Sequence, residues 1–225
     1  MERADLNAIP EVVIMRLPLY MRALTNMLTK GVEVVSSQDL GDRLGVTPAQ
    51  IRKDFSYFGR FGKQGRGYNV RYLLGELRQI LGLDREWQTA VIGTGRLGGA
   101  IIGYPGFAPE GFKVVVAFDV NPEHVGKKTG DVSVLSMDDL EKTIQRMNIQ
   151  IVILAVPAAE AQAVIDRLVK CGVKAILNYA PVQSQVPPDV RVRNIDPVLS
   201  LQSMTYYLKQ YATAPATAGR APATG

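Results

Sequence analysis

The sequence predicts an α/β protein with two domains, an N-terminal winged helix-turn-helix and a C-terminal doubly wound parallel sheet. Three observations support this prediction. Short capped helices and a basic, glycine-rich stretch fill residues 1–85. From Thr89 onward, apolar segments of strand length alternate with segments of helical periodicity, which is typical of a parallel sheet covered on both faces. A G-x-G-x-x-G motif at residues 93–98 directly follows the first of those apolar segments.

The composition excludes several classes of protein. The 225 residues are 47% apolar and 21% charged, as in ordinary globular proteins, and suffice for two cores. No apolar run approaches the roughly 18 residues that span a bilayer, and the N-terminus lacks a signal-peptide core. We therefore expect a cytoplasmic protein without a membrane partner. A single cysteine excludes an internal disulfide framework.

Positive charge is concentrated in one stretch of the chain. The net charge is +5, yet residues 52–71 alone hold six basic side chains against one acidic residue, Asp54. Clustered positive charge of this kind is what a polyanionic partner requires. Taken alone, the stretch fits a solvated charged surface, a phosphate-binding loop or a grip on nucleic acid.

The first domain opens with two helices. Pro10 suits the first turn of a helix that continues to about residue 30, and Pro18 inside it predicts a kink or a break. Ser36 is the expected N-cap of a second helix over residues 37–44, with Asp39 in its first turn.

A third helix and a basic loop complete the first domain. Thr47 is the expected N-cap, Pro48 takes the first helical position, and Gln50 completes a capping box. Two short helices joined by a tight turn are typical of a helix-turn-helix. Glycines between residues 59 and 67 then permit a tight hairpin, the wing, before a helix near residues 69–83.

The second domain, residues 86–196, alternates strands and helices. Strands are expected near residues 89–93, 113–119, 149–157, 174–181 and 190–196. Helices are expected after residue 96, near 137–147 and from 158 to about 172. Residues 197–211 predict a terminal helix. Residues 212–225 are small and interrupted by proline, so a disordered tail is expected.

The glycine motif predicts a dinucleotide site in a Rossmann-like domain. Gly93 allows the tight turn, Gly95 lets the backbone approach a pyrophosphate, and Gly98 permits close packing of helix on strand. Asp119 ends the next strand, where a carboxylate accepts hydrogen bonds from the adenosine ribose and repels a 2′-phosphate. We therefore expect NAD(H) rather than NADP(H). A Rossmann-like domain without a dinucleotide is the alternative.

The same residues favour a sensor over a dehydrogenase. Hydride transfer usually needs an acid or base beside the nicotinamide. The only histidine, His124, falls on the adenosine side, where we expect an exposed loop residue. No catalytic constellation and no metal-ligand cluster is apparent. A small oxidoreductase and a DNA-binding protein with a nonfunctional Rossmann module stay open as alternatives.

Together these motifs resemble the Rex family of redox-sensing transcriptional repressors. The resemblance covers the chain except its final dozen residues, and its most specific block is IRKDFSYFG (51–59) with GKQGRGYN (62–69). It implies a homodimer whose terminal helix is exchanged between subunits. Such a dimer binds palindromic double-stranded operator DNA when NAD+ dominates, and releases it when NADH binds.

The resemblance also assigns residues to DNA. It implies that Arg52 and Lys53 reach base edges or phosphates from the third helix, the recognition helix. Tyr57 packs internally or reaches a phosphate, and Ser36 also caps its helix. The basic loop is expected at the backbone or minor groove. The full set of expected DNA contacts is Ser36, Ser37, Gln50, Arg52, Lys53, Ser56, Tyr57, Arg60, Lys63 and Arg66.

The ligand residues follow from the same resemblance. Val156 and Pro157 are expected beside the dinucleotide, where the 149–157 strand ends. The segment from Asn178 to Ala180 is expected at the nicotinamide. Arg16 and Asp196 resemble residues that pair in a state-dependent way between domains. The expected cofactor contacts are Gly93, Thr94, Gly95, Arg96, Leu97, Gly98, Tyr104, Asp119, Val156, Pro157, Asn178, Tyr179 and Ala180.

Overall fold

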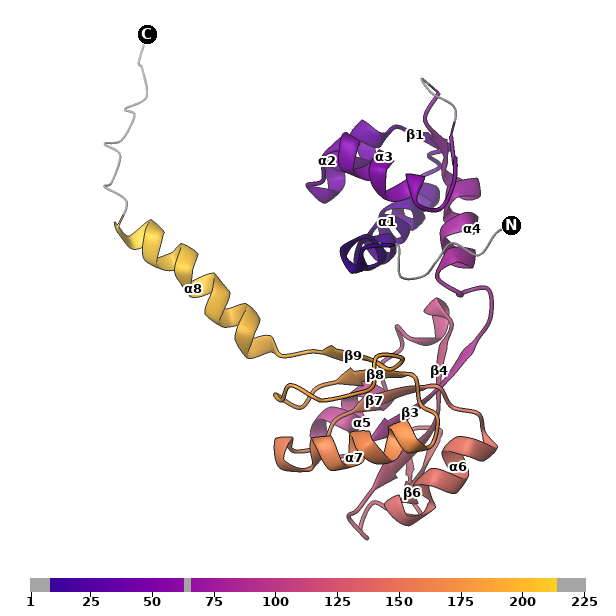
Figure 1. Ribbon diagram of the computed structural model, residues 1–225, viewed down its shortest axis with the longest axis vertical. Coiled ribbons are helices and arrows are strands. Elements are labelled where there is room, and N and C mark those ends of the chain that lie inside the picture. Colours follow the sequence, from indigo (N-terminus) through magenta and orange to yellow (C-terminus); the bar gives the residue numbers. More distant parts are fainter. Residues whose placement is uncertain (1–8, 63–65, 214–225) are drawn as a thin grey trace. The chain divides into compact units, whose positions relative to one another are not determined.

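The structure, a computed structural model, describes residues 9–62 and 66–213 (Figure 1). The chain divides into two compact units between Glu86 and Trp87. Within the described residues, no helix has the length and apolar character needed to cross a membrane. Lys63 and most of the expected tail lie outside the described residues.

The first unit is helical. Buried apolar residues on its helices, among them Leu17, Leu24, Ile51 and Leu73, form one core. The elements are α1 (Glu11–Thr29), β1 (Val34–Val35), α2 (Ser37–Leu44), α3 (Pro48–Ser56), β2 (Tyr68–Asn69) and α4 (Val70–Ile80).

The structure bears on two expectations for this unit. Helix α1 continues through Pro18 without a break, because a proline removes only one backbone donor and packing holds the rest. The hairpin expected between residues 59 and 67 includes residues 63–65, which lie outside the described residues, so it stays a prediction. After this loop, β2 pairs antiparallel with β1, which precedes α2, so the end of the basic loop is anchored to a strand that lacked a clear sequence signal.

The second unit is a seven-stranded sheet with the order β5-β6-β4-β3-β7-β8-β9. All neighbours are parallel except the β5–β6 pair, which confirms the expected parallel sheet. The strands are β3 (Trp87–Ile92), β4 (Phe112–Asp119), β5 (Lys128–Thr129), β6 (Val132–Ser136), β7 (Ile151–Leu154), β8 (Ala175–Asn178) and β9 (Arg191–Asn194).

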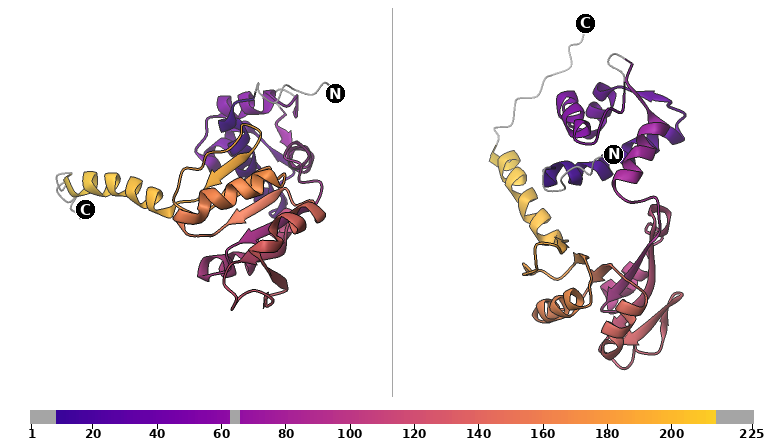
Figure 2. Two further views of the ribbon diagram at one scale, coloured as in Figure 1. Left: turned by 60° about the horizontal axis from the view of Figure 1, so that its bottom comes forward. Right: turned by 45° about the vertical axis from the view of Figure 1, so that its right-hand side comes forward.

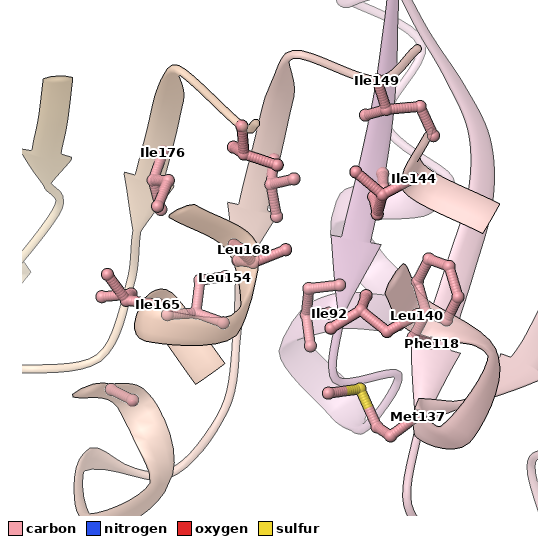
Figure 3. Close-up of a cluster of buried hydrophobic side chains, with 14 of the residues drawn as sticks. Ile92, Phe118, Met137, Leu140, Ile144, Ile149, Leu154, Ile165, Leu168 and Ile176 are labelled. Atoms are coloured by element: carbon pink, nitrogen blue, oxygen red, sulfur yellow. The ribbon is translucent and has the colours of Figure 1, made fainter. Parts of the chain in front are cut away.

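Helices cover both faces of this sheet (Figures 1 and 2). On one face, α6 (Leu140–Arg146) and α7 (Ala158–Lys170) bury Leu140, Ile165 and Leu168 against strand residues such as Ile92 and Phe118 (Figure 3). On the other face, α5 (Arg96–Ile102) packs Ile101 against Val91 and Ala117. Short 3-10 helices occupy Ala108–Glu110 and Met137–Asp139.

The chain ends in helix α8 (Pro197–Thr213), which extends two residues beyond the predicted end. Its apolar side chains are exposed: Leu199, Leu201 and Leu208 each keep more than 60% of their surface in solvent. Exposure of this extent on successive turns is unusual for a helix in water.

Candidate DNA interface and dinucleotide site

Two capped helices build the helix-turn-helix. The Ser36 hydroxyl accepts a hydrogen bond from the Asp39 backbone N–H at 3.0 Å, and the Asp39 carboxylate accepts one from the Ser36 N–H at 3.2 Å. Thr47 caps α3 by accepting from the Gln50 N–H at 3.2 Å. Between the helices, Gly45 has a φ of +65°, a conformation that favours glycine. The capping box predicted at Gln50 is not formed, because its side chain bonds to Asp54.

Helix α3 presents basic side chains to solvent. Arg52, Lys53 and Ser56 are exposed, whereas Tyr57 is half-buried. The guanidinium of Arg52 donates a hydrogen bond from Nη1 to the Ser37 hydroxyl at 2.9 Å. This contact joins the start of α2 to α3, so two of the predicted DNA-binding side chains lie together. The structure therefore forms a polar, positively charged surface on this motif.

Behind that surface lies a buried carboxylate, which the sequence did not reveal as important. Asp54 is fully buried. Arg16 donates to both of its oxygens, at 2.6 and 2.7 Å, and the Tyr20 hydroxyl and Gln50 amide each donate at 2.7 Å. Burial alone would raise the pKa of Asp54, but the hydrogen bonds from Arg16, Tyr20 and Gln50 outweigh it and lower this pKa. Asp54 thus ties the recognition helix to α1.

We expect Asp54→Asn to lower the free energy of unfolding of the first unit by roughly 3 kcal/mol, because it removes one partner of a buried ion pair. Since the folded state depresses the pKa of Asp54, its contribution is present above the ordinary carboxyl pKa and disappears as pH falls through the folded value. The difference in unfolding free energy between the wild type and Asp54→Asn should therefore shrink below about pH 4. Hydrogen exchange of the backbone amides of α1 and α3 measures this difference.

Asp42→Asn is the matched control for that prediction. Asp42 carries the same charge on the exposed surface of α2 and accepts a hydrogen bond from the Gln38 side-chain amide at 2.8 Å. We expect this variant to exchange like the wild type. Equal protection of α3 in Asp54→Asn and Asp42→Asn would show that the buried network is not stabilising.

The basic loop surrounds an open hollow of about 950 Å³, lined in part by Arg60, Arg66 and Asn69. The loop folds closely: a Cβ on Gly62 would lie 2.7 Å from the Gly67 carbonyl oxygen, and one on Gly67 would lie 2.7 Å from that of Val35. Both positions therefore require glycine, because a neighbouring backbone carbonyl lies too close for a side chain. Arg60 and Arg66 are exposed on this loop, as expected for contacts with a nucleic acid.

In the second unit, the glycine loop has the predicted geometry. Gly93 has a φ of +87°, and a Cβ there would lie 2.5 Å from the carbonyl oxygen of Ala155. A Cβ on Gly98 would lie 1.8 Å from the Gly93 carbonyl oxygen, so only glycine allows α5 to begin this close to β3. Gly95 has open space around its Cβ position, which leaves its backbone accessible to a ligand.

A cavity of about 820 Å³ adjoins this loop at the carboxyl ends of β3, β4 and β7. A cavity in this size range accommodates a small ligand or cofactor. Of the predicted contacts, its lining includes Gly93, Gly95, Arg96, Leu97, Asp119, Val156 and Pro157. It also includes residues that sequence reasoning missed, among them Val120, Asn121, His124, Met137, Val164 and Arg167.

The Asp119 carboxylate accepts hydrogen bonds from several protein groups, so it is not simply a free acceptor for a ribose. Its Oδ2 accepts from the Thr94 N–H at 2.7 Å, from the Thr94 hydroxyl at 2.5 Å and from His124 Nδ1 at 3.0 Å. Its Oδ1 accepts from the Asn121 N–H at 2.9 Å. Burial would raise the pKa of Asp119, but hydrogen bonds from Thr94, Asn121 and His124 outweigh it and lower this pKa far below its ordinary value. The carboxylate therefore stays ionised and holds the glycine loop.

The residues expected at the nicotinamide do not line this cavity. Asn178 is fully buried, and its side chain bonds to Ala180 and Asn194. Tyr104 is 58% exposed and packs edge-on against Phe107 at 5.1 Å between ring centroids. Asn178 thus shapes the turn after β8. Direct contacts of Tyr104, Asn178, Tyr179 and Ala180 with a nicotinamide remain predictions.

Arg16 and Asp196, which the resemblance pairs with each other, each have a partner nearby. Arg16 binds Asp54, as described above. The Asp196 carboxylate accepts from the Val198 N–H at 2.9 Å, at the start of α8. Their state-dependent pairing therefore remains a prediction.

Comparison with known proteins identifies the family. Residues 84–182 match the family model described as a CoA binding domain, and residues 8–56 match the one described as a putative DNA-binding protein N-terminus. The redox-sensing transcriptional repressor Rex of Roseiflexus sp. (strain RS-1) is 56% identical over 199 residues, covering 88% of this chain and 90% of that protein. Rex of Chloroflexus aurantiacus is 54% identical over 208 residues, covering 92% and 97%.

This chain belongs to the Rex family.

Two solved structures of RSP, a Rex-family repressor, are similar to this chain. RSP in complex with β-NAD+ and operator DNA has a TM-score of 0.86 and 43% identity, covering 91% of this chain and 94% of that one. RSP in complex with β-NADH has a TM-score of 0.83 and 40% identity, covering 91% and 96%. Rex proteins are transcriptional repressors, which confirms the expectation of a regulator rather than a dehydrogenase.

Proposed function

We propose that this Rex protein is a homodimer that binds palindromic operator DNA while NAD+ predominates and releases it when NADH occupies the cavity of the second unit. One observation carries the proposal: the same chain holds an exposed basic helix-turn-helix and a glycine-loop cavity beside an ionised Asp119. RSP has been solved with the same two kinds of ligand, in complex with β-NAD+ and operator DNA and in complex with β-NADH. The proposal includes a cytoplasmic location, where the protein would meet its operator DNA.

The residue assignments follow from exposure and position. Arg52 and Lys53, assisted by Ser37 and the loop arginines, contact DNA, which favours clustered cations. The glycine loop approaches the pyrophosphate, and Asp119 lies at the adenosine ribose, where its charge disfavours a 2′-phosphate. NADH can control DNA binding only if it binds the two states of the dimer with different affinities.

An anisotropy assay tests this function. The probe is a labelled palindromic duplex, starting from the operator that RSP binds, at fixed salt because phosphate contacts depend on ionic strength. We expect tight binding with NAD+ present and release as NADH replaces it. Binding that is indifferent to NADH, or equal on a scrambled duplex, would refute the proposal.

We propose that helix α8 is exchanged between two copies of this chain. Its exposed apolar side chains, including Leu201, Met204 and Leu208, need a cover. A second copy supplies one and also places two recognition helices on half-sites about 34 Å apart. The family resemblance supports the same arrangement.

Charged substitutions in α8 test the dimer. We expect Leu201→Glu plus Leu208→Glu to produce monomers in light scattering and to abolish tight operator binding, because burying two carboxylates in an apolar contact is costly. Gln202→Glu plus Ser203→Glu adds the same charge at polar positions and should stay dimeric. A monomeric wild-type protein would contradict the exchange.

A further inference from the structure

His124 is not the exposed loop residue that its position suggests. Its ring lies half-buried in the loop after β4 and lines the dinucleotide cavity. Nδ1 lies 3.0 Å from Asp119 Oδ2 and 3.1 Å from the Thr94 hydroxyl oxygen. Among the described residues, no hydrogen bond involves the other ring nitrogen, Nε2. Nδ1 of His124 is therefore held by protein groups, whereas Nε2 is available for a hydrogen bond to a ligand in the cavity.

The hydrogen-bond pattern determines which nitrogen carries the proton. Asp119 Oδ2 belongs to an ionised carboxylate and can only accept. Nδ1 must therefore be the donor to Asp119 Oδ2. The Thr94 hydroxyl donates its own proton to the same carboxylate oxygen, so its oxygen can accept a bifurcated hydrogen bond from Nδ1–H. In the neutral ring, Nε2 then has a free lone pair and is an acceptor.

Asp119 has little capacity left for a ribose. Its two oxygens already accept four hydrogen bonds, and a carboxylate offers about four lone-pair sites. A ribose diol brings two hydroxyl donors to this end of the cavity. Oδ2 accepts three of the four existing bonds, whereas Oδ1 accepts one and keeps a single lone-pair site, so one of the two hydroxyls needs a different acceptor nearby.

We propose that His124 binds the ligand: its Nε2 accepts a hydrogen bond from an adenosine ribose hydroxyl of NAD(H), with Asp119 holding the ring in the required tautomer. This inference rests on the proposed function. It also makes His124 a residue that selects between cofactors. A 2′-phosphate presents only acceptors toward the Nε2 lone pair and the Asp119 charge, whereas a hydroxyl supplies the missing donor.

Because the chain contains a single histidine, long-range ¹H–¹⁵N spectra of the tag-free wild-type protein test the proposal directly. We expect a protonated Nδ1 and an unprotonated Nε2. Saturation with NADH or with ADP-ribose should shift the Nε2 resonance, because both carry the adenosine ribose. Reduced nicotinamide mononucleotide lacks that ribose and should leave it unchanged. A protonated Nε2, or no shift on saturation by NADH, would overturn the proposal.

Binding measurements provide the second test. We expect His124→Phe, which keeps a planar ring without nitrogens, to weaken NADH and ADP-ribose about tenfold, the effect of one hydrogen bond. NADPH and reduced nicotinamide mononucleotide should bind as before, so selectivity for NADH over NADPH falls about tenfold. His124→Gln retains an acceptor and should recover part of the loss.

Glu123→Gln, a substitution at the exposed neighbour in the same loop, is the matched control and should leave all four affinities unchanged. Equal weakening of NADH and NADPH in His124→Phe would indicate a purely structural role and refute the proposal. If the wild-type protein bound no NADH at all, the proposed function itself would fail. Normal NADH binding by His124→Phe, with an unchanged histidine spectrum in the wild type, would defeat this inference alone.

Discussion

Replacing Arg52 and Lys53 together with alanine should weaken operator binding roughly a thousandfold or more. A good contact to a base or phosphate is worth about 1–3 kcal/mol, and a dimer loses each contact twice. Both side chains are exposed on α3, and Arg52 also bonds to Ser37. NADH affinity should not change, because the dinucleotide cavity lies in the other unit. Anisotropy and calorimetry measure the two affinities.

The control for this prediction removes the same charge elsewhere. Lys142→Ala plus Lys170→Ala changes exposed residues on α6 and α7 of the second unit. We expect only a slight loss of DNA affinity from the lower net charge. If this control weakened binding as much as the α3 variant, general electrostatic attraction rather than the recognition helix would explain the affinity.

Gly98→Ala should reduce NADH affinity by roughly a hundredfold. A methyl group at this position would lie 1.8 Å from the Gly93 carbonyl oxygen, less than any allowed contact. The glycine loop must therefore move, and displacements of about 1 Å in a positioning loop cost this much. DNA binding should persist, and its release should require about a hundredfold more NADH than in the wild type. Isothermal calorimetry measures the first effect and anisotropy the second.

Two neighbouring glycines separate loop geometry from general damage. At Gly99, the nearest atom to an added Cβ is 3.8 Å away, so Gly99→Ala should bind NADH normally. Gly95→Ala meets no protein atom within 4 Å and should leave the melting temperature unchanged. Its methyl group would nevertheless occupy the backbone surface that a pyrophosphate approaches. Tight NADH binding by Gly95→Ala would show that the dinucleotide lies elsewhere.

Local signals in the sequence predicted much of the fold. Ser36, Thr47 and Pro48 mark helix starts because capping depends on a few adjacent residues. The glycine motif predicted the turn at Gly93, since backbone conformation and close approach leave no other residue type possible. Long apolar segments predicted the parallel strands because both faces of such a sheet are buried.

Features that depend on distant residues were not predictable in this way. Strand β6 (Val132–Ser136) is short and carries serines, so its pattern alone does not distinguish it from a loop. The pairing of β2 with β1 joins residues more than thirty positions apart. The Asp54 network likewise depends on Arg16 and Tyr20 of another helix, and an isolated acidic residue in a basic stretch gives no sign of burial.

In the dinucleotide site, too, local sequence signals predicted some features, whereas others depend on tertiary structure. Asp119 was predicted from its place at a strand end, but not its bonds to Thr94 and His124, which depend on how the following loop folds back. Asn178 supports the turn after β8 through bonds that the sequence did not indicate, and its contact with the ligand stays a prediction. A motif locates a site, whereas the partners of each side chain follow from tertiary structure.

The central claim is that NADH and operator DNA oppose each other on one protein. Linkage requires the effect to be reciprocal: if NADH weakens DNA binding by some factor, DNA must weaken NADH binding by the same factor. The direct measurement is the dissociation constant of NADH for the wild-type protein, free and saturated with operator duplex at one salt concentration. We predict weaker NADH binding to the complex, by the factor that NADH imposes on DNA. Equal NADH affinity in the two states would contradict the account.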